Sequence, residues 1–180
     1  MNFVYIGIIV VVLILILFLL IKSYLNKVKV YVIKIDEADK NIDLLLQKKL
    51  ELFTNIKDKT KETLDLDILE DLPKVKTKNL DSFEKDKAYE DLEKDIKDSL
   101  IYNKKLILDE ELQTLLDSLK NTNIELRATK KYYNDFADLY NEKVNRFPKK
   151  IIARIKGYDE IDYYETKEQE EFEILKEKNN

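Results

Sequence analysis

Nineteen consecutive residues near the N-terminus, from Phe3 to Ile21, carry no charge. As an α-helix rising about 1.5 Å per residue they would extend about 28 Å, close to the roughly 30 Å hydrocarbon thickness of a bilayer. Only Gly7 in this stretch lacks an apolar or aromatic side chain. A core helix of a soluble domain usually has polar residues along one face. The stretch therefore predicts a transmembrane helix over residues 3–21.

The flanks of this stretch favour an uncleaved anchor over a secretory signal. A secretory signal has a basic segment before its apolar run and small residues at its cleavage site. Here no Lys or Arg precedes Phe3, and Lys22-Ser23-Tyr24-Leu25-Asn26 follows the run. A lipoprotein would need a cysteine to acylate, and the chain has none. We therefore expect the span to stay in the lipid bilayer.

Lysines gather on one side of the predicted span and indicate its orientation. Lys22, Lys27, Lys29 and Lys34 follow it, whereas residues 1–2 precede it without a charged side chain. Lys and Arg are enriched on the cytoplasmic side of membrane spans. We expect a single-pass cell-membrane protein with its N-terminus outside and its C-terminal domain in the cytoplasm.

The composition limits the chemistry that the rest of the chain can perform. The chain is 38% charged with a net charge of −4, which does not predict a nucleic-acid partner. It contains no His and no Cys, so imidazole triads, thiol nucleophiles, histidine-bound haem or zinc, and disulfides are excluded. Its two glycines, Gly7 and Gly157, cannot build a phosphate-binding loop. We expect no catalytic residue, no cofactor and no metal ion.

Beyond the span, apolar residues repeat with the period of helices that pack in a bundle. The first series has alternating spacings of three and four, and one of its members is polar. It consists of Ile35, Ala38, Ile42, Leu45, Lys49, Leu52 and Ile56. Because nothing between residues 21 and 35 breaks a helix, we expect the span to continue into this helix and to end near Thr63.

The middle of the chain predicts a loop and a second helix. Between Asp65 and Asn79 the helical spacing is lost, and Pro73 disfavours helix at the residue before it. We expect a loop there, with a helical turn around residues 67–71. A second, highly charged helix is expected over residues 81–104. Its apolar stripe consists of Phe83, Leu92, Ile96 and Leu100.

A third long helix is predicted from Asp109 to Phe147-Pro148. Asp109 is suited to cap it, because Asp accepts hydrogen bonds from first-turn N–H groups. Its stripe consists of Leu112, Leu115, Leu119, Thr122, Leu126, Thr129, Tyr133, Phe136 and Tyr140. A short helix over residues 149–156 should end at Gly157, a favoured residue just past a helix C-terminus.

These elements predict an all-α fold. A single N-terminal transmembrane helix is followed by an antiparallel helical bundle of three long helices and a short C-terminal helix. The predicted organisation is a short outer N-terminus (1–2), the span (3–21), a cytoplasmic bundle (22–157) and an acidic C-terminal tail (158–180).

Two blocks of residues resemble the LemA family. The first is Ile35-Asp36-Glu37-Ala38, Asn41-Ile42-Asp43 and Leu46 to Ile56, with Thr54 where the family has a proline. The second is Tyr132-Tyr133-Asn134-Asp135, Tyr140-Asn141, Phe147-Pro148, Ile152-Ala153 and Gly157-Tyr158, in the family's order. The motif residues that we single out are Asp36, Ala38, Ile42, Asp43, Asn55, Tyr133, Asn134, Tyr140, Asn141, Phe147, Pro148 and Gly157. The resemblance implies a membrane-anchored bacterial helical bundle, with no established biochemical role and no catalytic residue.

Polar motif residues at heptad spacing allow two interpretations. The sets spaced by seven are Arg127, Asn134 and Asn141, then Tyr133 and Tyr140, then Asp36 and Asp43. In the first interpretation they form an interhelical hydrogen-bond ladder that fixes the register of the bundle. In the second they line a groove for a ligand or a metal ion. The first is favoured, because the chain has no His and only two Asp at this spacing.

The C-terminal part of the chain separates its charges. Nine Lys/Arg and three acids lie from Arg127 to Lys156, whereas nine acids and three Lys lie from Tyr158 to Asn180. The acidic tail could fold back on the basic region, or both could be solvated. Alternatively a basic amphipathic turn contacts a lipid surface or an acidic partner. That turn consists of Lys149, Lys150, Arg154 and Lys156 with Ile151, Ile152 and Ile155.

Three functions remain compatible with these patterns. A membrane-tethered interaction or scaffold module ranks first, because long amphipathic helices dominate and reactive side chains are scarce. A regulatory stalk associated with another membrane protein ranks second. A hydrolase using Asp, Glu, Lys and Tyr ranks last, because no cleft-forming segment is visible. The expected partners are the lipid bilayer and an unidentified protein, and a homo-oligomer is compatible with the chain.

Overall fold

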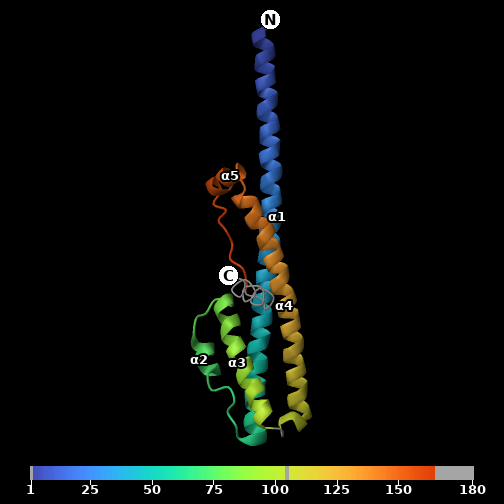
Figure 1. Cartoon of the computed structure of the whole chain (residues 1–180), viewed down its shortest axis with the longest axis vertical. Coiled ribbons are helices and arrows are strands. Elements are labelled where there is room, and N and C mark those ends of the chain that lie inside the picture. Colours follow the sequence, from blue (N-terminus) through green and yellow to red (C-terminus); the bar gives the residue numbers. More distant parts are fainter. Residues whose placement is uncertain (1, 104–105, 165–180) are drawn as a thin grey trace, which may run out of the picture. The chain divides into compact units, whose positions relative to one another are not determined.

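A computed structural model describes residues 2–103 and 106–164 of the chain (Figure 1). Its helices are α1 (Asn2–Leu64), α2 (Leu72–Thr77), α3 (Ser82–Tyr102), the 3-10 helix η1 (Leu106–Leu108), α4 (Glu110–Asn145) and α5 (Lys149–Ile155). The described residues contain no strand, and the predicted all-α class is confirmed.

Helix α1 is a single element of 63 residues, so the predicted continuity from the span into the next helix is confirmed. It ends at Leu64, next to the predicted end at Thr63. Every side chain from Phe3 to Leu20 is exposed. This part of α1 is long and apolar enough to cross a membrane, and its most apolar stretch is exposed throughout.

The described residues form two compact units. The first holds α1 up to Glu37 together with Tyr133–Tyr163, which includes the end of α4 and all of α5. The second holds Ala38–Tyr132 and Tyr164, which include the rest of α1, α2, α3, η1 and the first part of α4.

The core of the second unit is built from the predicted helix stripes. In α1 the predicted positions from Ala38 to Ile56 are all buried, Lys49 included. Leu46 and Phe53 are buried beside them, although the sequence pattern did not single them out. Each Leu, Ile or Phe side chain removed from water contributes about 1.5–3 kcal/mol. The heptad therefore identifies the seam of α1 correctly and underestimates its width.

The stripe of α3 differs from its prediction. Leu92 and Ile96 are buried as expected, but Phe83 is partly exposed and Tyr89 lies in the core. The helix begins with a capping box, in which the Asp81 carboxylate accepts from the Glu84 N–H at 2.8 Å and Glu84 accepts from the Asp81 N–H at 3.2 Å. This pairing fixes the start of α3 close to the predicted boundary.

The predicted loop between Asp65 and Asn79 is wrong in one respect, since it contains α2. Pro73 lies in the first turn of α2, where its missing N–H is not needed and its fixed φ suits a helix. The buried side chains of Leu69 and Leu72 hold this segment in the second unit. The expected turn at 67–71 is replaced by a turn at residues 70–71 that leads into α2.

The remaining helix ends agree with the sequence. The Asp109 carboxylate accepts a hydrogen bond of 2.9 Å from the Leu112 N–H, so the predicted cap of α4 is confirmed. Helix α5 ends before Gly157, whose φ of +70° is readily adopted by glycine. Of the predicted acidic tail, residues 165–180 lie outside the part of the chain that the structure describes.

Candidate functional site

A buried lysine of α1 forms the centre of a charged cluster in the second unit. The Lys49 side chain is 3% exposed, and its Nζ lies 2.6 Å from Glu93 Oε1 of α3. The same Nζ lies 5.8 Å from the ring centroids of both Phe53 and Tyr89. These are cation–π distances. The one polar member of the α1 stripe is therefore matched by a carboxylate and two aromatic rings.

Two further contacts join α3 to α4 around this cluster. Asn123 Nδ2 donates to Glu93 Oε2 at 2.9 Å. Lys130 of α4 forms an ion pair with Asp86 of α3, and both side chains are almost fully buried. Removing one partner of a buried pair leaves an uncompensated charge, which is strongly destabilising. The cluster therefore couples α1, α3 and α4 through charges that need one another.

A cavity of about 490 Å³ lies against this cluster. Its apolar lining comes from Ile96, Leu100, Leu116, Leu119 and Leu126, and its charged lining from Lys49, Asp86, Glu90, Glu93, Lys94, Lys97, Lys120, Arg127 and Lys130, with Asn123. Among the described residues, every buried side-chain polar atom has a hydrogen-bond partner. The buried charges are thus paired with one another, and these pairs hold the helices together.

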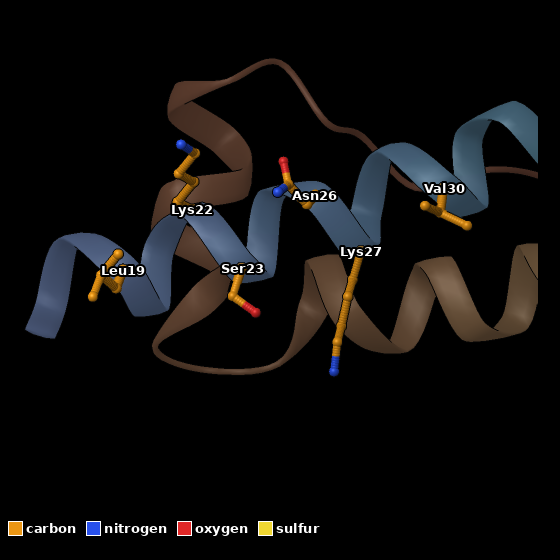
Figure 2. Close-up of a pocket in the computed structure, with 6 residues that line it drawn as sticks. All are labelled: Leu19, Lys22, Ser23, Asn26, Lys27 and Val30. Atoms are coloured by element: carbon orange, nitrogen blue, oxygen red, sulfur yellow. The ribbon is translucent and has the colours of Figure 1, made fainter.

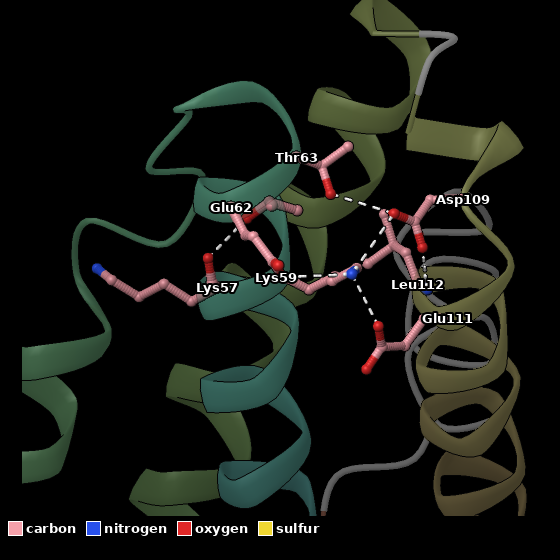
Figure 3. Close-up of polar contacts among 8 residues, drawn as sticks. Lys57, Lys59, Glu62, Thr63, Asp109, Glu111 and Leu112 are labelled. Carbon is pink, nitrogen blue, oxygen red and sulfur yellow. Dashed lines mark hydrogen bonds and ion pairs between the residues drawn. The ribbon is translucent and has the colours of Figure 1, made fainter.

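A second polar network joins the end of α1 to the start of α4 (Figure 3). Lys59 Nζ lies 2.7 Å from a Glu111 oxygen and 3.2 Å from Glu62, and Thr63 Oγ1 donates to Asp109 at 3.1 Å. Hydrogen bonding to Glu111 and then to Glu62 raises the pKa of Lys59. The Leu112 N–H holds the pKa of the Asp109 carboxyl below its usual range. The network stabilises this end of the bundle in its charged form.

In the first unit, two motif residues of α4 hold the segment that follows α5. Tyr140 donates to the Asp159 carbonyl at 2.8 Å. Asn141 Nδ2 donates to the Ile161 carbonyl at 2.8 Å, and Asn141 Oδ1 accepts from the Ile161 N–H at 2.9 Å. Asn141 also donates to the Tyr163 hydroxyl at 3.0 Å. We call this contact between Tyr140, Asn141 and residues 158–163 the clasp.

The clasp differs from the predicted interhelical ladder. The amide of Asn141 joins α4 to an extended segment, because its two ends match the N–H and C=O of one residue, Ile161. Burial raises the pKa of Tyr140, whose hydroxyl is engaged in the clasp. One contact of the expected interhelical kind is present in the second unit, where Ser82 Oγ of α3 donates to Asp43 of α1.

The other predicted residues have varied surroundings. Ala38, Ile42, Tyr133 and Asn134 are buried. Asp36, Asn55 and Arg127 are exposed, and Arg127 lines the cavity. Pro148 precedes the first residue of α5, and Phe147 is 80% exposed. Among the residues that the structure describes, no group of three or more carboxylates is placed to hold a metal ion.

The sequence interpretation missed the pair of Asp86 and Lys130. A signal was present, because Lys130 follows Leu126 by four residues and precedes Tyr133 by three, which is the spacing of the buried stripe. Asp86 similarly precedes the buried Tyr89 by three residues. Charged residues on an apolar stripe can therefore indicate buried partners, as Lys49 also illustrates.

Polar side chains lie along one face of α1 just after its exposed apolar part, and we call Lys22, Ser23, Asn26 and Lys27 the polar collar (Figure 2). A shallow cavity of about 410 Å³ is lined by Leu19, Lys22, Ser23, Asn26, Lys27 and Val30. Figure 2 shows the side chains of Lys22 and Lys27 extending to opposite sides of this face. Side chains thus change from apolar to cationic within one helical turn.

Helix α5 lies beside α1 at the level of this collar. The Tyr24 hydroxyl donates to the Lys143 carbonyl at 3.2 Å, and Lys149 Nζ lies 5.6 Å from the Tyr24 ring centroid. Ala153 is buried, whereas Ile151 and Ile155 are 55% and 77% exposed. Ile152, which the sequence grouped with them, is half-buried.

The fold defines the class of the protein as all-α, with one candidate membrane span among the residues that the structure describes. A sequence model of the LemA family matches residues 38–175, which include both predicted motif blocks except the start of the first. The chain belongs to the LemA family. A comparison with curated proteins finds no match.

Proposed function

We propose that this protein is a membrane-anchored helical interaction module, with residues 3–21 of α1 in the lipid bilayer and the bundle on the cytoplasmic side. One observation carries the proposal. The side chains of α1 are all exposed from Phe3 to Leu20, whereas the stripe that begins at Ile35 is buried. An uninterrupted apolar surface of this length is unfavourable in water and matches the lipid core.

The polar collar supports the orientation. Lys22 and Lys27 follow the apolar part of α1 directly, and Lys29 and Lys34 continue the series. Lysines at this distance from a span favour the cytoplasmic side and are attracted to anionic headgroups. The proposed arrangement therefore has the N-terminus outside.

A binding role fits the bundle better than catalysis. General acid–base chemistry needs a titratable group within reach of a substrate. In the second unit the carboxylates of Glu93 and Asp86 face Lys49 and Lys130 at close range, so these pairs hold helices together. The exposed surface of the bundle is suited to contact with another protein.

Anchoring and orientation can be tested with the full-length protein, because it has no native cysteine. Cysteine replaces Asn2 in one variant and Asn180 in another, and intact cells are treated with a membrane-impermeant maleimide. We expect labelling at position 2 without permeabilisation and at position 180 only after it. The protein should also stay in the membrane pellet after carbonate washing. Release by carbonate would contradict the anchor, and the reverse labelling would contradict the orientation.

The interaction role needs a separate experiment. Photocrosslinking amino acids at the exposed Leu44 and Ile124 sample the surface of the second unit. In native membranes we expect crosslinks to a defined soluble protein. Crosslinks only to a second copy of the chain would indicate a homo-oligomer, and none at either position would contradict the module.

A regulatory stalk is the second candidate, favoured by the continuity of α1 from Asn2 to Leu64. A continuous helix can transmit a displacement, whereas a tether needs no continuity. Val30→Pro would interrupt α1, since proline removes a helical hydrogen bond and clashes with the preceding turn. A stalk would lose its output in this variant. A simple anchored module would keep its crosslinks.

A further inference from the structure

We propose that the exposed surface of α5 docks onto the anionic headgroups of the same bilayer that holds α1. This α5 surface consists of the exposed Phe147, Ile151, Ile155, Lys149 and Arg154, with the half-buried Lys150 beside them. The inference rests on the proposed function, because it requires residues 3–21 to be in lipid. It adds a second membrane contact that is separate from the span.

The position of α5 relative to the bilayer follows from the contacts that Tyr24 of α1 makes with α4 and α5. Tyr24 lies three residues after Ile21, which corresponds to about 4.5 Å along a helix axis. The headgroup layer extends roughly 5–7 Å beyond the hydrocarbon core on each side. Tyr24 contacts both the Lys143 carbonyl, near the end of α4, and the Lys149 ammonium of α5. With Ile21 at the edge of the core, α5 lies in the headgroup layer.

The exposed side chains have the composition of an interfacial contact. Phe147, Ile151 and Ile155 are 80%, 55% and 77% exposed, respectively. Ala153 is buried, and its carbonyl accepts from the Tyr158 N–H at 3.0 Å, a local bond that closes the C-terminal end of α5. Apolar side chains flanked by Lys and Arg are typical of helices that lie at the boundary between headgroups and acyl chains.

The shortness of α5 is compensated by the anchor. A helix of seven residues buries too little apolar surface to hold a free protein on a membrane. Here α5 belongs to the same compact unit as the membrane-facing part of α1. Docking is then an intramolecular step at high effective concentration, so a weak contact can be well populated.

Position and charge favour a lipid surface over an acidic protein. The collar lysines Lys22 and Lys27 lie on α1 directly after the apolar stretch, and Lys149 reaches Tyr24 two residues beyond Lys22. The cations of α1 and α5 therefore lie at one level near the end of the span. The ligand at that level is the layer of lipid phosphates.

The test uses the full-length protein with one introduced cysteine carrying the polarity-sensitive dye NBD. Ile151→Cys reports on the α5 surface, and Leu44→Cys, at an exposed position of the second unit, is the matched control. Both are reconstituted in vesicles of phosphatidylcholine alone and of equal parts of phosphatidylcholine and phosphatidylglycerol. We expect a blue shift and quenching by brominated lipids at position 151 in the anionic vesicles, and neither at position 44.

A charge variant tests whether the cations of α5 cause its docking onto the bilayer. Lys149→Gln, Lys150→Gln and Arg154→Gln together should abolish the blue shift at position 151, while the helical CD signal and resistance to carbonate are retained. Equal emission in neutral and anionic vesicles, or a shift that persists in the charge variant, would overturn the proposal. A blue shift at position 151 that appears only when native membrane proteins are present would show that the α5 surface binds a protein and not lipid. Loss of the protein from carbonate-washed vesicles would instead count against the anchor itself.

Discussion

At the scale of single residues, the buried Lys49 of α1 is paired with Glu93 of α3. Lys49 lies on the buried seam of α1, as its heptad position indicates. Its partner Glu93 lies 44 residues later in a helix that is charged on most of its surface. Nothing in the spacing distinguishes Glu93 from its neighbours, because the pairing depends on how α3 packs against α1.

This pairing predicts an asymmetric effect of mutation. Glu93→Leu leaves the Lys49 ammonium buried without its carboxylate, which should lower the free energy of unfolding by about 3 kcal/mol. The double variant Lys49→Met/Glu93→Leu should recover most of the loss, because two apolar side chains replace two buried charges. Urea unfolding of the detergent-solubilised protein, followed by far-UV CD, measures both.

The control for this prediction is Glu62→Gln, at a side chain that is 74% exposed. It should shift the free energy of unfolding by less than about 0.5 kcal/mol. A double variant no more stable than Glu93→Leu alone would show that the charges are not the source of the effect.

Asn141 carries a prediction of its own. Asn141→Leu removes the hydrogen bonds to both backbone groups of Ile161 and to Tyr163. Each such bond has a net contribution of about 1 kcal/mol, so residues 158–163 should leave α4 much of the time. Cleavage after Asp159 and Glu160 by an acid-specific protease, monitored by mass spectrometry, should be faster. The variant Asn145→Leu, at an exposed position of the same helix, should be cleaved at the parental rate. Equal cleavage rates in both variants would contradict the clasp.

At the scale of elements, periodicity predicted the long helices and missed α2. Helices α1 and α4 have stripes long enough for the alternation of three and four to be distinct. Helix α2 has six residues, too few for a period to be recognised. It forms because Pro73 suits a first turn and because Leu69 and Leu72 are buried in the second unit.

The cap of α4 predicts a pH dependence. The Leu112 N–H stabilises the charged form of Asp109, so its folded pKa is below its unfolded pKa. The contribution of the cap is therefore complete above about pH 4, the usual Asp pKa, and is lost as the pH falls through the folded pKa. Asp109→Asn keeps the acceptor but does not titrate, so its urea midpoint should fall less steeply in acid. Asp109→Ala should lower the midpoint at neutral pH as well.

These midpoints are measured by urea unfolding across the acidic range. Parallel curves for the parent and Asp109→Asn would show that the cap does not contribute to the acid dependence. If Asp109→Ala unfolds at the same urea midpoint as the parent at neutral pH, the cap does not stabilise α4.

At the scale of the whole molecule, the proposed span should determine where the protein is found. The double variant Leu13→Asp/Ile14→Asp places two carboxylates at the centre of the apolar stretch. Two central aspartates cost about 6 kcal/mol on insertion, comparable with the total gain from the apolar side chains. We expect a large part of the protein to be released by carbonate. Ile124→Asp, in the second unit, should leave membrane retention unchanged, and equal retention of both variants would contradict the span.

The sequence predicted the class and the family, because hydrophobic period and two motif blocks are properties of the linear chain. It did not predict the clasp. Asn141 was identified by its spacing, but its partner is the backbone of Ile161. Every residue has the same backbone groups, so the residue types do not indicate which one a side chain binds. The α5 surface was visible as a pattern. Its exposure and its level beside Tyr24 required the three-dimensional arrangement.

The clasp has an electrostatic consequence. Asp159 is bonded by Tyr140, Ile161 by Asn141, and Tyr163 donates to Asp138, so the chain turns back along α4 after α5. Phe136 of α4 in turn lies near Tyr31, about 10 Å further along α1 than Tyr24. With the span in lipid, the acidic residues of 158–163 would follow α4 away from the bilayer. In the proposed orientation the cations of α1 and α5 would lie nearer the bilayer than these acids, and the resulting dipole would be aligned with the field of the electrical double layer.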